Sequence, residues 1–238
     1  MPGTTEPSGP AITAQVRAHL APCGLDLVQP FRVAWYQEAC PTHPLPDLGD
    51  PGHLGLLIGN TRALWPRFLA ARAAEPALAA DPHPLDRFVE RSLRAGLAPV
   101  PVAWEVRFAP EPPPRRVAMQ RLAEISGLAA LSPAHLSVHP EYGPWIALRA
   151  AIVLAVAGPE QRPPAPALAC DCDHGCLPRL REALEAGVPA SQADVRDHWR
   201  RWLAVRDGCP LGRDHRYSDQ QIRYHYAGDL TLDPADRG

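Results

Sequence analysis

The stretch from Leu136 to Val156, LSVHPEYGPWIALRAAIVLAV, decides the fold of this chain. Its second half, Trp145 to Val156, holds eleven apolar residues interrupted only by Arg149, whereas a membrane-spanning helix needs roughly 20. Turn residues bound this half, with Gly143-Pro144 before it and Gly158-Pro159 after it. Composition and boundaries predict a central β-strand buried on both faces, although the length and the alanine content also permit a core helix.

Arg149 is the only charged residue in this apolar half. A guanidinium keeps its proton in a protein and is costly to bury without a partner, so Arg149 has to meet a carboxylate, backbone carbonyls or an anionic ligand. In one interpretation it is structural, pairing with Glu141 or Glu105 or extending to solvent. In the other it binds an acidic ligand at a functional site.

The composition is that of an ordinary globular protein, with 46% hydrophobic and 21% charged residues in a chain of 238. The formal net charge of -2 provides no basic surface for nucleic acid or for an anionic membrane. Residues 1–10 are polar and rich in proline and glycine, without the apolar core of a signal peptide. We therefore expect a cytoplasmic protein whose six cysteines are reduced.

Hydrophobic spacing and capping residues predict an α+β protein. We expect a disordered lead-in over 1–10 and one domain over 11–238, with a Pro-rich internal connector at 157–169. Further strands are expected at 54–59 and 100–108. Helices are expected over 12–20, 84–95, 117–126, 178–186 and 194–206, with Gly96 ending the second of them. Further helices are expected to begin at residue 33, after an N-cap at Thr61 and after an N-cap at Ser218.

Three cysteines and a histidine lie within the seven residues Cys170 to Cys176, CDCDHGC. Thiolates this close suit Zn²⁺ or an iron–sulfur cluster, with Cys209 as a more distant ligand. Their spacing is not C-x2-C, however, and the Pro-rich flanks predict an exposed loop. We favour a redox-active or incidental cysteine loop over a metal centre, for which Cys170, Cys172 and Cys176 are the candidate ligands. No catalytic side chain is assigned, since no Ser/His/Asp order or H-E-x-x-H is present.

Three separated stretches resemble one family. His139 to Arg149, HPEYGPWIALR, is similar to its segment H-P-x-F/Y-G-x-W-x-A-I/L-R, and Pro30 to Glu38, PFRVAWYQE, to its P-F-x-V-A-W-Y-N-E. Near the end, HWRRW at 198–202, Arg206-Asp207 and RYSDQQ at 216–221 are similar to H-W-R-D-W, Y-R-D and R-Y-S-E-E-Q. These motifs resemble those of the cobalamin-processing family named for methylmalonic aciduria and homocystinuria type C (CblC, MMACHC), and the resemblance covers about residues 12 to 226.

The resemblance implies a flavin-reductase or nitroreductase-like mixed sheet flanked by helices. It also implies an enzyme, a cyanocobalamin reductase or alkylcobalamin dealkylase, that removes the upper axial ligand of cobalamin bound with its lower base detached. In the family, cyanide is removed by reduction with a flavin, FMN or FAD, and an alkyl group by transfer to the thiolate of glutathione. A Pro- and Arg-containing family loop at 110–116, with Arg115 and Arg116, implies a homodimer.

The resemblance also assigns site residues by matched position. The corrinoid pocket would be lined by Val117, Ala118, Met119, Gln120, Ser137 and Leu148. Arg149 and Arg206 would bind the carboxylates of glutathione or of another thiol. The chain departs from the family at Ala103, at Glu124 and at Ala130-Leu131-Ser132, where the family has a run of tyrosines. These departures leave open a flavin- or metal-dependent oxidoreductase with a different substrate, or a non-catalytic corrinoid carrier.

Overall fold

The computed structural model describes residues 7–164, 166–168, 172–185, 187 and 192–229. They belong to two compact units, unit 1 within Met1–Ala129 and Ala147–Pro166, and unit 2 within Ala130–Ile146 and Ala167–Gly238. The single domain over 11–238 stays a prediction. In the described parts of the chain, no helix is long and apolar enough to cross a membrane.

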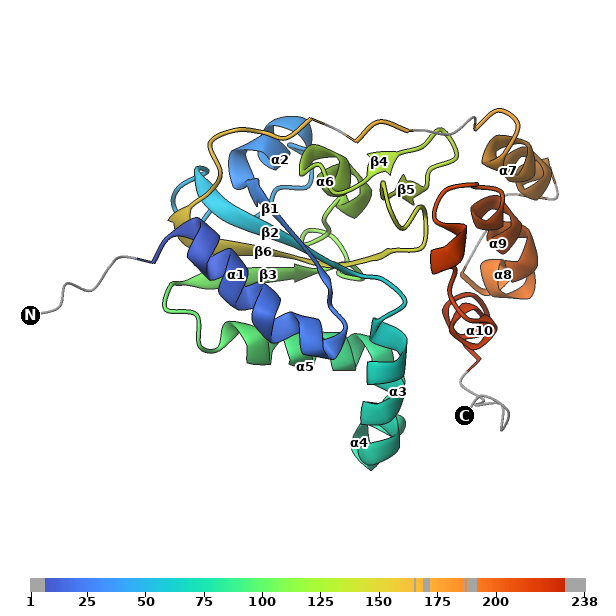
Figure 1. Cartoon of the computed structure of the whole chain (residues 1–238), viewed down its shortest axis with the longest axis horizontal. Helices are drawn as coiled ribbons and strands as arrows, with labels where there is room; N and C mark the ends of the chain where they lie inside the picture. Colours follow the sequence, from blue (N-terminus) through green and yellow to red (C-terminus); the bar gives the residue numbers. More distant parts are fainter. Residues whose placement is uncertain (1–6, 165, 169–171, 186, 188–191, 230–238) are drawn as a thin grey trace, which may run out of the picture. The chain divides into compact units, whose positions relative to one another are not determined.

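A four-stranded sheet with the order β1-β2-β6-β3 forms the centre of unit 1 (Figure 1). The strands are β1 (Leu27–Arg32), β2 (His53–Asn60), β3 (Trp104–Phe108) and β6 (Ala147–Ala157). The strand interpretation of the apolar half of 136–156 is confirmed, because β6 lies between β2 and β3 and is buried from Ala150 to Leu154.

The α+β class is confirmed, but the expectation of a mixed sheet is wrong. All three strand pairings of this sheet are antiparallel. The apolar pattern of a strand marks where it lies and how far it is buried, but carries no information on the direction of its neighbours.

Helices cover both faces of this sheet. The helices α1 (Gly9–Leu20) and α5 (Pro84–Leu97) lie on one face, and α2 (Val33–Ala39) and α6 (Met119–Ile125) on the other (Figure 1). The predicted stripe of Ile12, Val16 and Leu20 is at most 1% exposed, as expected for apolar residues four apart on a helix. Unit 1 also contains η1 (Ala21–Cys23), α3 (Leu64–Ala74) and α4 (Pro76–Ala79).

Several predicted helix boundaries are wrong. Helix α5 continues through Gly96 to Leu97. The glycine serves the packing of α1 against α5, because a Cβ at position 96 would lie 2.9 Å from Leu20 Cδ2. Thr61 is not the N-cap of α3, which is Ala63; the Thr61 hydroxyl donates to Asp26 Oδ2. Helix α1 begins at Gly9, inside the predicted lead-in, of which residues 1–6 lie outside the described residues.

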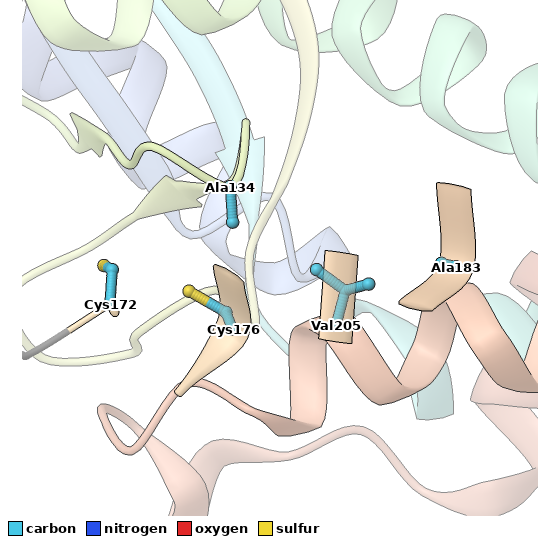
Figure 2. Packing of buried hydrophobic residues seen from close by; sticks show 5 residues of the cluster. All are labelled: Ala134, Cys172, Cys176, Ala183 and Val205. Carbon is cyan, nitrogen blue, oxygen red and sulfur yellow. The ribbon is translucent and has the colours of Figure 1, made fainter. Parts of the chain in front are cut away.

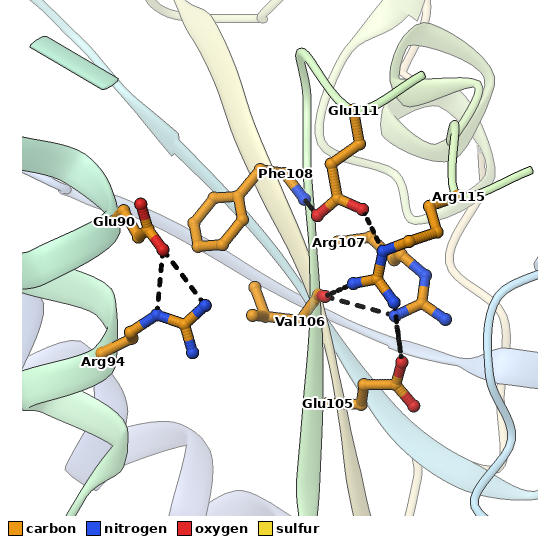
Figure 3. A network of polar contacts seen from close by, with 8 residues as sticks. All are labelled: Glu90, Arg94, Glu105, Val106, Arg107, Phe108, Glu111 and Arg115. Carbon is orange, nitrogen blue, oxygen red and sulfur yellow. Dashed lines mark hydrogen bonds and ion pairs between the residues drawn. The ribbon is translucent and has the colours of Figure 1, made fainter. Parts of the chain in front are cut away.

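The Pro-rich loop 110–116 covers the outer edge of β3 (Figure 3). Glu111 Oε1 accepts a hydrogen bond from Phe108 N–H at 2.9 Å, and Arg115 Nη2 donates to Val106 O at 3.1 Å. Arg115 also pairs with Glu111 and Glu105. The loop thus occupies backbone groups that an edge strand otherwise offers to another chain. The homodimer through this loop stays a prediction.

Unit 2 combines a short hairpin with helices. The hairpin pairs β4 (Ala130–Leu131) with β5 (Ser137–Val138). The helices are α7 (Cys176–Glu185), α8 (Gln192–Asp197), α9 (Trp199–Asp207), η2 (Arg213–His215) and α10 (Asp219–Ala227). One buried cluster contains Ala134, Cys172, Cys176, Ala183 and Val205 (Figure 2), and a second contains Trp145, Leu203, Tyr217 and Ile222.

Two helix predictions in unit 2 have different outcomes. The single helix expected over 194–206 is wrong, because the chain breaks at His198, whose φ of -113° and ψ of 24° are not helical. The cap at Ser218 is confirmed, since its hydroxyl oxygen accepts a hydrogen bond from Gln221 N–H at 3.2 Å.

Candidate functional site

Arg149 lies near the start of β6, where this strand pairs with the end of β2, and it is half-buried. Its Nε donates a hydrogen bond of 2.7 Å to Oδ1 of Asn60, the fully buried last residue of β2. Asn60 Nδ2 in turn donates to Thr61 O at 2.7 Å, which fixes the amide with its oxygen toward Arg149. A neutral amide orients a guanidinium without neutralising it. The hydrogen bond to Asn60 therefore sets the orientation of the Arg149 guanidinium, a group whose planar shape suits a carboxylate.

A pocket of about 320 Å³ in unit 1 includes Arg149 in its wall. Its lining contains the apolar residues Val89, Val106 and Phe108 together with several charged residues. The charged members are Asp86, Glu90, Arg94, Glu111, Arg115 and Arg149. The volume lies at the lower end of the range of about 300–1,000 Å³ that is usual for small-molecule sites. It accommodates a small acidic group or part of a peptide-sized thiol, not a whole corrinoid.

Four of the predicted pocket residues lie at the start of α6, a helix that contacts β6. They are Val117 and Ala118, just before the helix, and Met119 and Gln120, its first two residues. Val117 and Met119 are buried, Ala118 is half-buried and Gln120 is exposed. The Ala118 N–H donates to the hydroxyl oxygen of Tyr36 at 2.8 Å, so α2 fixes the start of α6. Burial raises the pKa of Tyr36 to about 12.

We expect Tyr36→Phe to lower the free energy of unfolding by about 1 kcal/mol at neutral pH, because Ala118 N–H loses its acceptor. Unfolded tyrosine ionises above pH about 10, whereas folded Tyr36 keeps its proton to about 12. The stability that the tyrosine contributes is therefore complete below pH about 10 and is lost as the pH rises through that window. Urea unfolding of both proteins should show their difference narrowing there. A difference that stays constant would contradict the raised pKa of Tyr36.

Leu148 and Ser137, the other predicted pocket residues, belong to different units. Leu148 is half-buried on β6 opposite Gly59. Ser137 lies on β5 opposite Leu131, and its hydroxyl is buried without a hydrogen-bond partner among the described residues. A buried hydroxyl that lacks a partner is costly and is typical of a position that meets a ligand or an ordered water. Ser137 therefore fits a role in holding a polar group of a ligand.

Arg206, the second arginine predicted for the thiol, lies on α9 in unit 2. Its Nε donates to Pro144 O at 2.8 Å, and its Nη2 donates to Pro144 O and, at 3.0 Å, to Ile146 O. The guanidinium carbon lies 4.7 Å from the ring centre of Trp145 and 4.8 Å from that of Tyr217. Arg206 thus holds the segment 144–146, which leads into β6, and its Nε and Nη2 donors are occupied by carbonyls.

Two cysteines of the predicted loop are buried, although Asp173 and His174 between them are exposed. Cys172 and Cys176 are 8% and 1% exposed within an apolar cluster of unit 2, whereas Cys170 lies outside the described residues. Among the side chains that the structure describes, no group of three or more metal-binding residues is arranged to hold a metal ion. The expectation of an exposed loop is therefore wrong for Cys172 and Cys176, because α7 begins at Cys176 and packs against α9.

Sequence reasoning missed two groups that position the arginines. Asn60 follows the apolar run 54–59 and is fully buried. A buried amide needs a partner, so this asparagine carried a usable signal. The ring of Tyr217 beside Arg206 gave no such signal, because an aromatic residue in a polar motif is compatible with simple core packing.

Comparisons with known proteins agree with the resemblance in the sequence. No family model matches the chain. A "cyanocobalamin reductase / alkylcobalamin dealkylase" of Homo sapiens is 26% identical over an alignment of 239 positions, which covers 92% of this chain and 78% of the relative. The proteins of the same name from Danio rerio and Mus musculus are 29% and 28% identical, covering 83% and 92% of this chain and 81% and 79% of the relatives.

A solved structure is also similar. The C. elegans B12-trafficking protein CblC, described as a homologue of human MMACHC, matches with a TM-score of 0.62 at 20% identity, covering 94% of this chain and 98% of that chain. This match shows the fold. Together with the three relatives, it shows that the chain is similar to CblC-type proteins over most of its length.

Proposed function

We propose that this protein removes the upper axial ligand of cobalamin that is bound with its lower base detached. The single observation that carries the proposal is Arg149, which a neutral amide orients in the wall of a pocket. The chain's relatives bear the name cyanocobalamin reductase / alkylcobalamin dealkylase, which supports this substrate class. Val117, Ala118, Met119, Gln120, Leu148 and Ser137 are the residues proposed to line the corrinoid site.

Arg149 is the proposed anchor for the acidic end of a thiol co-substrate, glutathione or another carboxylate-bearing thiol. Asn60 holds the Nε of Arg149 and so orients the guanidinium, whose planar fork of donors has the geometry of the two oxygens of a carboxylate. The adjoining pocket has room for such a group but not for a corrinoid. For Arg206 we propose a positioning role, because it holds the carbonyls of Pro144 and Ile146 a few residues before Arg149.

Dealkylation needs no protein nucleophile. The thiolate sulfur attacks the alkyl carbon, the new C–S bond forms as the Co–C bond breaks, and the electron pair of that bond stays on the corrinoid. The protein contributes the position of the sulfur and a site from which water is excluded. For cyanocobalamin, a reduced flavin, FMN or FAD, supplies the electron and cyanide leaves. We propose a flavin-reductase-like fold for this chain together with this second activity.

A second candidate is a flavin-dependent oxidoreductase that acts on a different, smaller substrate. The size of the described pocket favours it, as does Ala130-Leu131-Ser132, where the family has tyrosines that grip the corrinoid. The two candidates differ in one respect that is simple to measure, because only the first requires a corrinoid to bind.

Anaerobic assays distinguish the candidates. Purified protein is mixed with methylcobalamin and glutathione, and separately with cyanocobalamin, reduced nicotinamide cofactor and a flavin, and the absorbance spectrum of the corrinoid is followed. We expect loss of the alkyl ligand, with S-methylglutathione as product, in the first mixture. Binding without loss of either ligand would identify a carrier, and no corrinoid binding would favour the second candidate. Either result would exclude the proposed reaction.

A further inference from the structure

Two buried thiols of unit 2 are in direct contact. Cys172 and Cys176 are hydrogen-bonded to each other, and Figure 2 shows the sulfur of Cys176 directed toward Cys172. The backbone holds this arrangement, because Cys172 O accepts hydrogen bonds from Leu177 N–H at 3.0 Å and from Gly175 N–H at 3.3 Å. The chain therefore forms a tight turn between the two cysteines that leads directly into α7.

A third thiol lies near this pair. The backbone at Gly208 approaches Cys176 so closely that a Cβ there would lie 3.1 Å from Cys176 Cα, and the next residue is Cys209, which is 2% exposed. Burial, together with the hydrogen bond to Cys172 and the proximity of Cys209, raises the pKa of Cys176 to about 11. Cys176 is therefore protonated at neutral pH, whereas Cys172, at 8% exposed, is the more accessible of the two.

We propose that Cys172 and Cys176 are a reversible thiol–disulfide site that exchanges with small disulfides such as the oxidised form of a low-molecular-weight thiol. Their side chains are close enough to share a hydrogen bond, and both backbones belong to one short turn. A disulfide between them would therefore close a ring within this single turn. The proposal does not depend on the corrinoid reaction, since no residue of the proposed corrinoid or thiol sites takes part in it.

The exchange balances as two displacements. The thiolate of Cys172 attacks one sulfur of the small disulfide and expels its other half as a thiolate. The thiolate of Cys176 then attacks the sulfur of Cys172 and expels the second half. Overall, the two cysteines lose two protons and two electrons, and the small disulfide takes up both and becomes two thiols. Mildly alkaline pH favours the second step, because it increases the fraction of Cys176 that is deprotonated.

Mass spectrometry tests the site. The experiment uses the full chain with Cys170→Ser, so that the remaining thiols of the loop are the described ones. The folded protein is incubated with excess glutathione disulfide at mildly alkaline pH, quenched by alkylation, denatured and digested with trypsin. Cys172 and Cys176 fall in the peptide 150–179, and Cys209 falls in the peptide 207–213. We expect the first peptide to be two hydrogen atoms lighter than its reduced form, unalkylated and unlinked, and to return to its original mass with excess reduced glutathione.

Variants provide the controls. Cys172→Ser and Cys176→Ser should each abolish the mass loss, whereas Cys40→Ser, which alters a buried cysteine of unit 1, should leave it complete. Circular dichroism is used to check that each variant is folded, so that a missing disulfide cannot be caused by unfolding. A linkage between the two peptides, which indicates a bridge to Cys209, or full alkylation of both cysteines after oxidation would overturn the proposal.

Discussion

Replacing Arg149 with lysine is expected to lower kcat/KM for the thiol in dealkylation by roughly 10- to 100-fold. Lysine keeps the charge but loses the planar pair of donors and the Nε that binds Asn60. Charge-assisted hydrogen bonds contribute about 1.5–3 kcal/mol each, and every 1.4 kcal/mol corresponds to about a factor of ten. The loss should appear in KM for the thiol and not in kcat, because the carboxylate is remote from the reacting sulfur.

The matched control for this variant is Arg91→Lys on α5. Arg91 is exposed and pairs with Glu75, away from the pocket wall. Steady-state kinetics at several thiol concentrations should show unchanged constants for this control. Affinity for methylcobalamin alone should be the same in both variants and in the wild type. A fall in corrinoid affinity with an unchanged KM for the thiol would show that Arg149 serves the corrinoid instead.

Replacing Arg206 with methionine is expected to destabilise the protein by about 3 kcal/mol, because it removes hydrogen bonds from a charged donor that contribute about 1.5–3 kcal/mol each. The carbonyls of Pro144 and Ile146 lose their donors, and the space between the rings of Trp145 and Tyr217 loses its cation. Methionine fills much of the volume but supplies no hydrogen. Urea unfolding followed by tryptophan fluorescence measures the change.

Arg200→Met on the same helix is the control for that measurement. Arg200 also stacks on an aromatic ring, that of Trp199 at 4.6 Å, but it is exposed. An exposed cation–π contact contributes about 0.5–1 kcal/mol, so this variant should remain close to the wild type. Similar losses in both variants would show that Arg206 acts through stacking alone and that its carbonyl contacts carry little of the stability.

The sequence predicted those elements whose signal is local. The run 145–156 identified β6, the spacing of Ile12, Val16 and Leu20 identified α1, and Ser218 identified the start of α10. Features that depend on a partner far along the chain were missed. Gly96 has the residue type of a helix terminator, and its role in the packing of α1 is visible only in the folded structure. The direction of strand pairing likewise depends on two strands and cannot be inferred from the pattern of one.

The break at His198 shows a different limit of periodicity. Val195 and Trp199 keep helical spacing across the break, so the apolar pattern continues although the backbone does not. At the candidate site, the sequence predicted that Arg149 needs a carboxylate, backbone carbonyls or an anionic ligand, and it missed the amide of Asn60 that accepts from Nε. A pattern can indicate that a charge must be compensated. It cannot choose among partners that are about 90 residues away along the chain.

Titration of methylcobalamin with the purified protein tests the central claim most directly. The claim is that this chain binds a corrinoid with its lower base detached, next to an arginine that receives an acidic thiol. The account predicts a saturable change from the base-on to the base-off absorbance spectrum, complete at one protein per corrinoid. A spectrum that stays base-on in a large excess of folded protein would contradict it.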